Sequence, residues 1–152
     1  MNLKELLTSE RVATNVKAET WEDAVRAVGQ LMVDTGAVAE SYIDGMIRTC
    51  KELGPYIVIA PGVALPHSRP EDGVLKPCMA FISLDPPINF GNPENDPVSL
   101  VIAFGAVDNQ QHVDALRDMA TILAEPTNLE ALRAAKTKEQ ILQVMWSAPP
   151  AA

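Results

Sequence analysis

The stretch Gly54-Pro-Tyr-Ile-Val-Ile-Ala-Pro-Gly-Val-Ala-Leu-Pro-His67-Ser-Arg-Pro70 decides the fold class, because the hydrophobic period of the chain changes there. Tyr56–Ala60 is rich in β-branched residues and is bounded by Gly-Pro and Pro-Gly pairs, which predicts a strand. Val63–Leu65 predicts a second, shorter strand that leads into Pro66 and His67. The chain therefore has a β-rich centre, and the patterns on either side decide what covers it.

Further strands are expected on both sides of this stretch. Met79–Leu84 predicts one, and Val98–Val107 predicts the most buried one, because its apolar residues do not alternate with polar ones. Asp85–Pro97 holds four prolines and three asparagines, which predicts a loop, with a hairpin connection as one alternative. Val12–Ala18 predicts another short strand near the N-terminus.

Helical periodicity fills both ends of the chain. Thr20 is a capping residue, and Thr137-Lys-Glu-Gln140 forms a capping box. Helices on either side of a central group of strands predict a layered α/β domain with one sheet. We expect this single domain to span residues 1–147 and residues 148–152 to fray. The expected helices run from Leu3 to near Ser9, from Thr20 to near Gly36, through Tyr42 to Leu53, from after Asp108 to before Pro126, through Leu129 and Leu132, and from Thr137 through Met145.

Composition and charge exclude several classes of protein. The chain has 152 residues, of which 47% are hydrophobic and 21% charged, as in a single globular domain. A net charge of −8 argues against a partner nucleic acid and against binding to anionic lipid by charge alone. The longest mostly apolar run, Val98–Val107, is far shorter than the roughly 20 residues of a membrane span. No secretory signal is visible, so we expect no membrane insertion and a cytoplasmic location.

The chain contains only two histidines, and both lie at places that favour chemistry. Pro66 stiffens the backbone that presents His67, and Arg69 can hold an anionic group beside it. His112 lies near the start of the helix after the most buried strand, where free backbone N–H groups attract anions. Two imidazoles and an arginine favour a site for a transferred phosphoryl group, with one ring as nucleophile and the other as hydrogen-bond donor.

Structural alternatives stay open for both histidines: His67 as an ordinary loop residue and His112 as a helix-start residue bonded locally. A two-histidine metal site is not favoured, because the spacing is not His-x-x-x-His and no third ligand stands out. Cys50 falls on a helical apolar stripe and Cys78 enters a strand, which predicts two core thiols. No glycine-rich phosphate loop is present, so phosphoryl transfer here would use a protein donor.

Residues 54–70 resemble the active-site segment of the mannitol/fructose class of phosphotransferase-system enzyme IIA, and within it the ascorbate-specific branch. That branch has the Gly-Pro-Tyr lead-in and the His-x-Arg-Pro follow-on. The similarity continues through Asn95–Val98 and Asp108–His112 and covers roughly Leu3 to Met145. The resemblance implies a mixed β-sheet flanked by helices on both faces, with the active site at one edge of the sheet.

The resemblance also implies roles for individual residues. His67 matches the histidine that accepts a phosphoryl group from phosphorylated HPr, as tele-phosphohistidine, and His112 matches the histidine that stabilises the group. Arg48 and Arg69 are alternative candidates for contact with the phosphoryl group, and Ser68 stands where members nearer the mannitol proteins have glycine. No metal or cofactor is implied.

The implied function is phosphoryl relay in sugar uptake. From His67 the group would pass to a cysteine of enzyme IIB, and the membrane-bound enzyme IIC would couple this transfer to import, with L-ascorbate as the sugar of the branch. One alternative is a regulatory enzyme IIA-like domain that signals by its phosphorylation state, and another is a non-catalytic binding module. The oligomeric state is open, with a dimer as one alternative.

Transfer between proteins also favours an apolar rim around the site, expected from Pro61, Val63, Leu65, Pro66 and Pro70.

Overall fold

The computed structural model describes residues 3–147, which build one five-stranded mixed sheet. The strand order is β1-β4-β5-β3-β2. β1 runs parallel to β4 and β3 parallel to β5, whereas β4 pairs antiparallel with β5 and β2 with β3. The tail 148–152, predicted to fray, lies outside the described residues. The strands are β1 (Val12–Val16), β2 (Val58–Ala60), β3 (Val63–Ala64), β4 (Cys78–Ile88) and β5 (Val98–Gly105).

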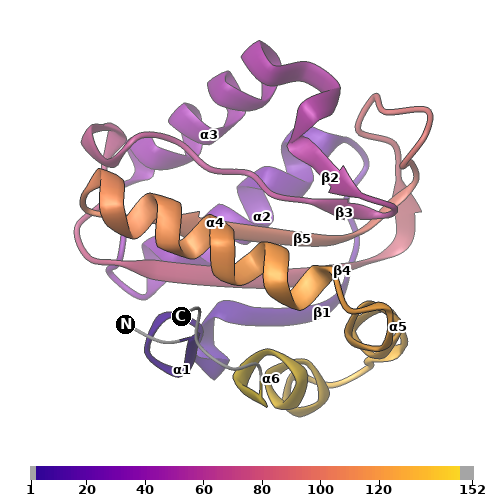
Figure 1. The fold of residues 1–152 in the computed structure, drawn as a ribbon. Coiled ribbons are helices and arrows are strands. Elements are labelled where there is room, and N and C mark those ends of the chain that lie inside the picture. The colour runs from indigo at the N-terminus through magenta and orange to yellow at the C-terminus, as the bar shows by residue number, and fades with distance from the viewer. Residues whose placement is uncertain (1–2, 148–152) are drawn as a thin grey trace.

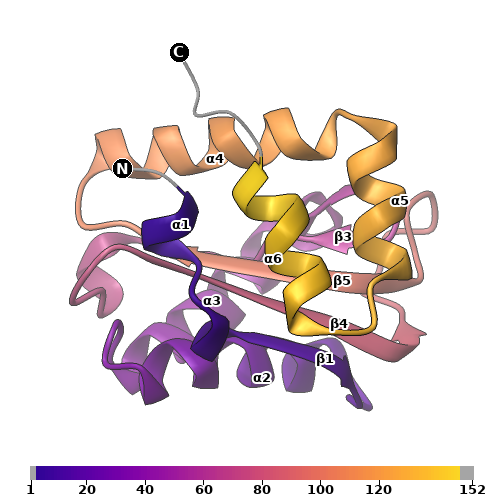
Figure 2. The same cartoon turned by 90° about the horizontal axis from the view of Figure 1, so that it is seen from below.

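Helices cover both faces of this sheet, as predicted (Figures 1 and 2). In the view of Figure 2, α2 (Trp21–Asp34) and α3 (Glu40–Leu53) lie below the sheet. The other face carries α1 (Leu3–Leu6), α4 (Asn109–Leu123), α5 (Pro126–Ala134) and α6 (Lys138–Ser147). Short 3₁₀ turns lie at Ser9–Arg11, Gly54–Ile57 and Pro70–Asp72. Among the described residues, no helix has the length and the hydropathy needed to span a bilayer.

β5 belongs to both layers of the core. Ile102 and Phe104 pack toward α4, whereas Val101 and Ala103 pack toward α2 and α3. Because helices cover both faces, every one of these positions is apolar, and the strand shows no polar alternation. The prediction that this segment is the most buried strand is confirmed.

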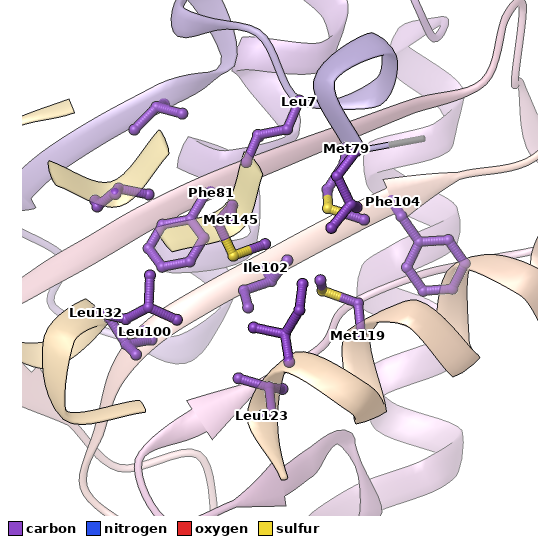
Figure 3. Close-up of a cluster of buried hydrophobic side chains, with 14 of the residues drawn as sticks. Leu7, Met79, Phe81, Leu100, Ile102, Phe104, Met119, Leu123, Leu132 and Met145 are labelled. Carbon is purple, nitrogen blue, oxygen red and sulfur yellow. The ribbon is translucent and has the colours of Figure 1, made fainter. Parts of the chain in front are cut away.

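The core on the α4 side fixes one face of the sheet. Figure 3 shows Phe81 of β4 and Ile102 of β5 beneath Met145 of α6 and Met119 of α4. All four side chains are fully buried. Side chains from four elements far apart in the sequence therefore exclude water from this face together.

The helix ends follow the local chemistry expected from the sequence. Thr20 Oγ1 accepts a hydrogen bond from the Asp23 N–H at 3.2 Å and so caps α2. Thr137 and Gln140 exchange two bonds of 3.2 Å, side chain to backbone in each direction, which is the predicted capping box. α3 ends at Gly54, whose φ of 61° is a conformation that favours glycine.

The strand predicted over Tyr56–Ala60 is wrong in its first half. Gly54–Ile57 forms a 3₁₀ turn, and β2 begins only at Val58. Pro55 fixes φ near −65°, which suits a helical turn directly after α3. β-branched composition alone therefore placed the start of the strand too early.

The loop predicted over Asp85–Pro97 is also too long, because β4 continues to Ile88 through two prolines. β1 pairs with β4 only as far as Leu84. After Leu84, the side of β4 that faces β1 makes no further pairing with that strand. A proline costs no ladder bond at a free edge. The alternative of a hairpin between β4 and β5 is confirmed by their antiparallel pairing.

Candidate functional site

The chain leaves β3 and passes beside the first turns of α4 (Figure 1). Three aromatic rings meet in this region. His67 stacks on Phe104, with ring centroids 5.2 Å apart and planes 19° apart. His112 lies edge-on to both rings, 5.3 Å from His67 and 5.1 Å from Phe104. The fold thus brings together the two histidines that the sequence singled out, and it adds a phenylalanine from the end of β5 as their support.

One hydrogen bond determines which nitrogen of His67 is free. His67 Nδ1 lies 2.8 Å from the carbonyl oxygen of Leu65. A carbonyl oxygen only accepts hydrogen bonds, so Nδ1 carries the proton of the neutral ring. The lone pair of the neutral imidazole is therefore on Nε2, the tele nitrogen, which is free to act as a nucleophile.

The surroundings keep both imidazoles neutral. Burial lowers the pKa of His67, and the bond to the Leu65 carbonyl opposes part of that shift. Burial also lowers the pKa of His112, and a charge on His67 would lower it further. Because the ordinary pKa is about 6.5, both rings are mainly uncharged at neutral pH.

The first turn of α4 fixes the position of His112. Asp108 Oδ1 accepts a hydrogen bond from the Gln111 N–H at 2.8 Å, and the Asp108 carbonyl accepts one from the His112 N–H at 3.1 Å. The Gln111 N–H is therefore bound to the cap, and the attraction of an anion to this helix end stays a prediction. The side chain of His112 remains half-buried beside His67.

Arg48, Ser68 and Arg69 converge on the carboxylate of Asp72. Arg48 Nη2 lies 3.0 Å from Asp72 Oδ2, the Arg69 N–H donates to the same oxygen at 3.3 Å, and the Ser68 hydroxyl also donates to it. The Ser68 hydroxyl, followed by the Arg69 N–H and Arg48, holds the pKa of Asp72 below its ordinary value. The carboxylate is therefore charged at neutral pH and anchors the chain that follows His67.

The side chain of Ser68 faces away from the surface. The residue is only 3% exposed, and its hydroxyl also lies 3.3 Å from Thr49 Oγ1. α3 can approach this closely because residue 45 is glycine: a Cβ there would lie 2.9 Å from Ser68 Oγ. The side chains of Arg48 and Arg69 are exposed, and the predicted roles of these three residues at the phosphoryl group stay predictions.

Tyr42 is the main component of this site that sequence reasoning missed, because it reads as one more member of the apolar stripe of α3. Its side chain is fully buried, and burial raises the pKa of its hydroxyl. The hydroxyl lies 2.7 Å from the carbonyl oxygen of Phe104 and 3.0 Å from the amide nitrogen of Ser68. A tyrosine within a buried stripe needs a partner for its O–H, and that was the available signal.

The expected apolar rim is mostly wrong. Val63, Leu65 and Pro66 are buried, the first two in the core on the α4 side, so they cannot face a partner. Two exposed apolar side chains lie close to His112 in the sequence instead: Val107 is 42% and Val113 47% exposed. An apolar rim is thus available from the end of β5 and from α4.

The described residues hold no group of three metal-ligating side chains that could bind a metal ion. Cys50 and Cys78 are buried free thiols, and burial raises their pKa values to about 12 and about 11. Both are core thiols, as predicted.

Proteins of similar sequence match almost the whole length of this chain. The chain is 33% identical to the ascorbate-specific PTS system EIIA component of Escherichia coli strain K12 over 147 residues, which covers 95% of this chain and 96% of that protein. The corresponding protein of Shigella boydii is equally similar, with the same coverage.

Solved structures give the same result. The mannitol-specific cryptic phosphotransferase enzyme IIA CmtB from Escherichia coli superposes with a TM-score of 0.84 and 31% identity, covering 95% of this chain and 98% of that one. Enzyme IIA of the Escherichia coli mannitol system, solved in complex with phosphorylated enzyme IIB, superposes with a TM-score of 0.80 and 26% identity over 92% of this chain and 98% of that one.

The family model agrees with both comparisons. The model described as phosphoenolpyruvate-dependent sugar phosphotransferase system, EIIA 2, matches residues 5–147. Members of this family are phosphotransferases that relay phosphoryl groups during sugar uptake. With a matching mixed sheet and paired histidines at its edge, the chain belongs to the EIIA 2 family of the phosphoenolpyruvate-dependent sugar phosphotransferase system.

Proposed function

We propose that His67 receives the phosphoryl group from phosphorylated HPr and passes it to a cysteine of enzyme IIB. The observation that carries this proposal is the 2.8 Å contact between His67 Nδ1 and the Leu65 carbonyl, which leaves Nε2 free beside His112. The domain that performs the relay is the predicted one, residues 1–147. It acts in the cytoplasm, with the membrane enzyme IIC as an indirect partner.

The first transfer exchanges one P–N bond for another. The Nε2 lone pair of neutral His67 attacks phosphorus, the bond to the HPr imidazole breaks, and its electron pair stays on the HPr ring. The product ring carries a proton on Nδ1 and phosphorus on Nε2, and it therefore gains positive character. The Leu65 carbonyl, which accepts a hydrogen bond from Nδ1–H, stabilises this charge, so no proton has to leave His67 during the step.

His112 is proposed to bind the transferred group. A neutral imidazole has one N–H to donate, and the ring centroids of His112 and His67 lie 5.3 Å apart, so this donor stands beside the group that His67 would carry. Catalysis of this kind consists mainly of positioning and charge stabilisation. The lowered pKa of His112 keeps one of its nitrogens as a hydrogen-bond donor without adding a fixed charge.

The sugar is proposed to be L-ascorbate, on the basis of the relatives named for it at 33% identity. The mannitol enzyme IIA solved with phosphorylated enzyme IIB supports enzyme IIB as the second partner. A net charge of −8 would speed encounter with a partner that is basic around its own histidine.

The test of this function is a labelled chase. Enzyme I, HPr and labelled phosphoenolpyruvate should place an acid-labile, base-stable label on the wild-type protein. Unlabelled enzyme IIB of an ascorbate system should then remove the label faster than enzyme IIB of a mannitol system, which serves as the matched control. Label that neither enzyme IIB removes would favour the regulatory alternative. Faster removal by the mannitol enzyme would contradict ascorbate as the sugar.

Phosphoryl acceptance should stay fast in mildly acidic solution. Only neutral His67 can attack, and burial lowers its pKa below the ordinary value of about 6.5. The rate should therefore fall only when the pH drops below that value. A stopped-reaction pH profile in a His112→Ala background isolates the titration of one ring, and NMR titration of His67 checks it independently. A midpoint at or above 6.5 would show that burial does not control this imidazole.

A further inference from the structure

We propose that Tyr42 is a positioning residue for phosphoryl transfer, a role that rests on the proposed function of His67. The Tyr42 side chain comes from α3, on the face of the sheet opposite to α4. Its hydroxyl nevertheless reaches the backbone directly after His67 and the end of β5. It therefore connects α3 to the chain after His67 and to the end of β5, the strand whose Phe104 side chain packs on the α4 side.

A hydroxyl has one proton, so its contacts can be assigned. The shortest contact, 2.7 Å to the Phe104 carbonyl, takes the proton, because a carbonyl can only accept. The Ser68 N–H then donates to the lone pairs of the hydroxyl oxygen at 3.0 Å. The Ser68 carbonyl lies farther away, at 3.2 Å. The Tyr42 hydroxyl thus binds the Ser68 N–H and the Phe104 carbonyl, and its removal would take one hydrogen-bond partner from each of these backbone groups.

The contacts of the Tyr42 hydroxyl with Ser68 and Phe104 fix two groups that position the His67 imidazole. Ser68 follows His67 in the chain, so its amide position fixes the peptide plane next to the imidazole. Phe104 supplies the ring on which His67 stacks, at a centroid distance of 5.2 Å. A single oxygen therefore sets how the imidazole lies relative to its stacking partner.

Other contacts hold the two flanks of the segment. Upstream, the Leu65 N–H donates to the Ile57 carbonyl at 2.9 Å. Downstream, Asp72 accepts from the Arg69 N–H and from the Ser68 hydroxyl. None of these three contacts reaches β5, and β3 pairs with β5 only at Val63 and Ala64, before His67. Tyr42 therefore adds a connection from the chain after His67 to the strand that carries Phe104.

The test compares Tyr42→Phe with the wild type. Removal of one oxygen should lower kcat for acceptance from phospho-HPr by about 10²-fold through misplacement of the imidazole. KM for phospho-HPr should change less than about two-fold, because a fully buried hydroxyl cannot touch the partner. In ¹⁵N NMR spectra, the ring resonances of His67 should shift, because the imidazole moves relative to Phe104 and to the Leu65 carbonyl that binds Nδ1.

The matched control is Ser83→Ala, which removes another buried hydroxyl, the one that accepts from the Asn15 N–H at 2.9 Å. Its kinetics and its His67 spectrum should match the wild type. Tyr42→Phe with wild-type kcat and a wild-type spectrum would overturn the proposal, and so would equal losses in both variants. A wild type that takes no label would instead overturn the proposed function itself.

A second perturbation covers the case in which Tyr42→Phe does not fold. The chain has two tyrosines, and Tyr56 is 81% exposed, so a Tyr56→Phe background leaves Tyr42 as the target of 3-fluorotyrosine incorporation. Fluorine makes the hydroxyl a stronger donor to Phe104 and a weaker acceptor from Ser68. The His67 ¹⁵N resonances and kcat should both shift, and unchanged values would overturn the proposal.

Discussion

Replacement of His67 by alanine is expected to abolish labelling from phospho-HPr, with a loss of about 10³-fold or more. Alanine removes Nε2, the nitrogen that the Leu65 carbonyl leaves free by binding Nδ1. Labelling is measured as acid-labile, base-stable phosphate on the protein after incubation with enzyme I, HPr and phosphoenolpyruvate. His67 is half-buried and lies in a loop, so its replacement leaves the core unchanged and the variant should fold.

His112→Ala is the matched control, since it removes the neighbouring imidazole and leaves the nucleophile in place. It should still take label, at a rate lower by about 10²-fold, as expected for the loss of one hydrogen-bond donor to a transition state. The interpretation fails if His67→Ala takes label at the wild-type rate, or if only His112→Ala loses it. In that second case the roles of the two rings would have to be exchanged.

The largest expected loss of stability comes from Phe81→Ala. Phe81 is fully buried in β4 and lies opposite Val12 of β1 and Ile102 of β5, under the helices of the α4 side (Figure 3). Removal of a buried phenylalanine costs about 3–5 kcal/mol, from lost burial and from the cavity left behind. That is a large part of the roughly 5–15 kcal/mol by which domains are stable. Urea unfolding followed by circular dichroism measures it.

Tyr56→Ala provides the comparison, because it removes an aromatic ring that is 81% exposed. Its free energy of unfolding should stay within about 0.5 kcal/mol of the wild type. Equal losses in the two variants would mean that the surroundings of Phe81 do not form the rigid core described above. A Phe81→Ala loss below about 1 kcal/mol would mean that the core collapses into the space.

Local signals in the sequence were sufficient for most of the fold. Capping at Thr20 and Thr137 and the unbroken apolar run of β5 each depend on a few neighbouring residues, and each was predicted. The two wrong boundaries have different causes. The 3₁₀ turn at Gly54–Ile57 follows from the local effect of Pro55 directly after α3, whereas the end of β4 depends on residues far away in the sequence. Whether Pro86 and Pro87 can lie in a strand is decided by where β1 stops pairing, which no local pattern reports.

The site divides in the same way. The two histidines were predicted from their positions beside strand and helix ends, and the fold places their rings together. Tyr42 and Asp72 were missed, because both act through contacts with Ser68. The contact of Tyr42 spans 26 residues of sequence, and the contact of Asp72 depends on the geometry of the loop after His67. The rim was mispredicted because a short strand predicted over Val63–Leu65 does not show from the sequence which of its faces is covered. The structure buries both Val63 and Leu65 in the core on the α4 side.

The single available nitrogen of His67 has a kinetic consequence. Nδ1 is bound to Leu65, one face of the ring lies on Phe104, and His112 stands at its edge. In the proposed relay, donor and acceptor proteins would therefore approach Nε2 from the same side, one after the other. Such a relay would follow an alternating, ping-pong scheme in which each partner is a competitive inhibitor of the other. Its flux depends on how quickly one partner leaves, so tight binding by either would slow it.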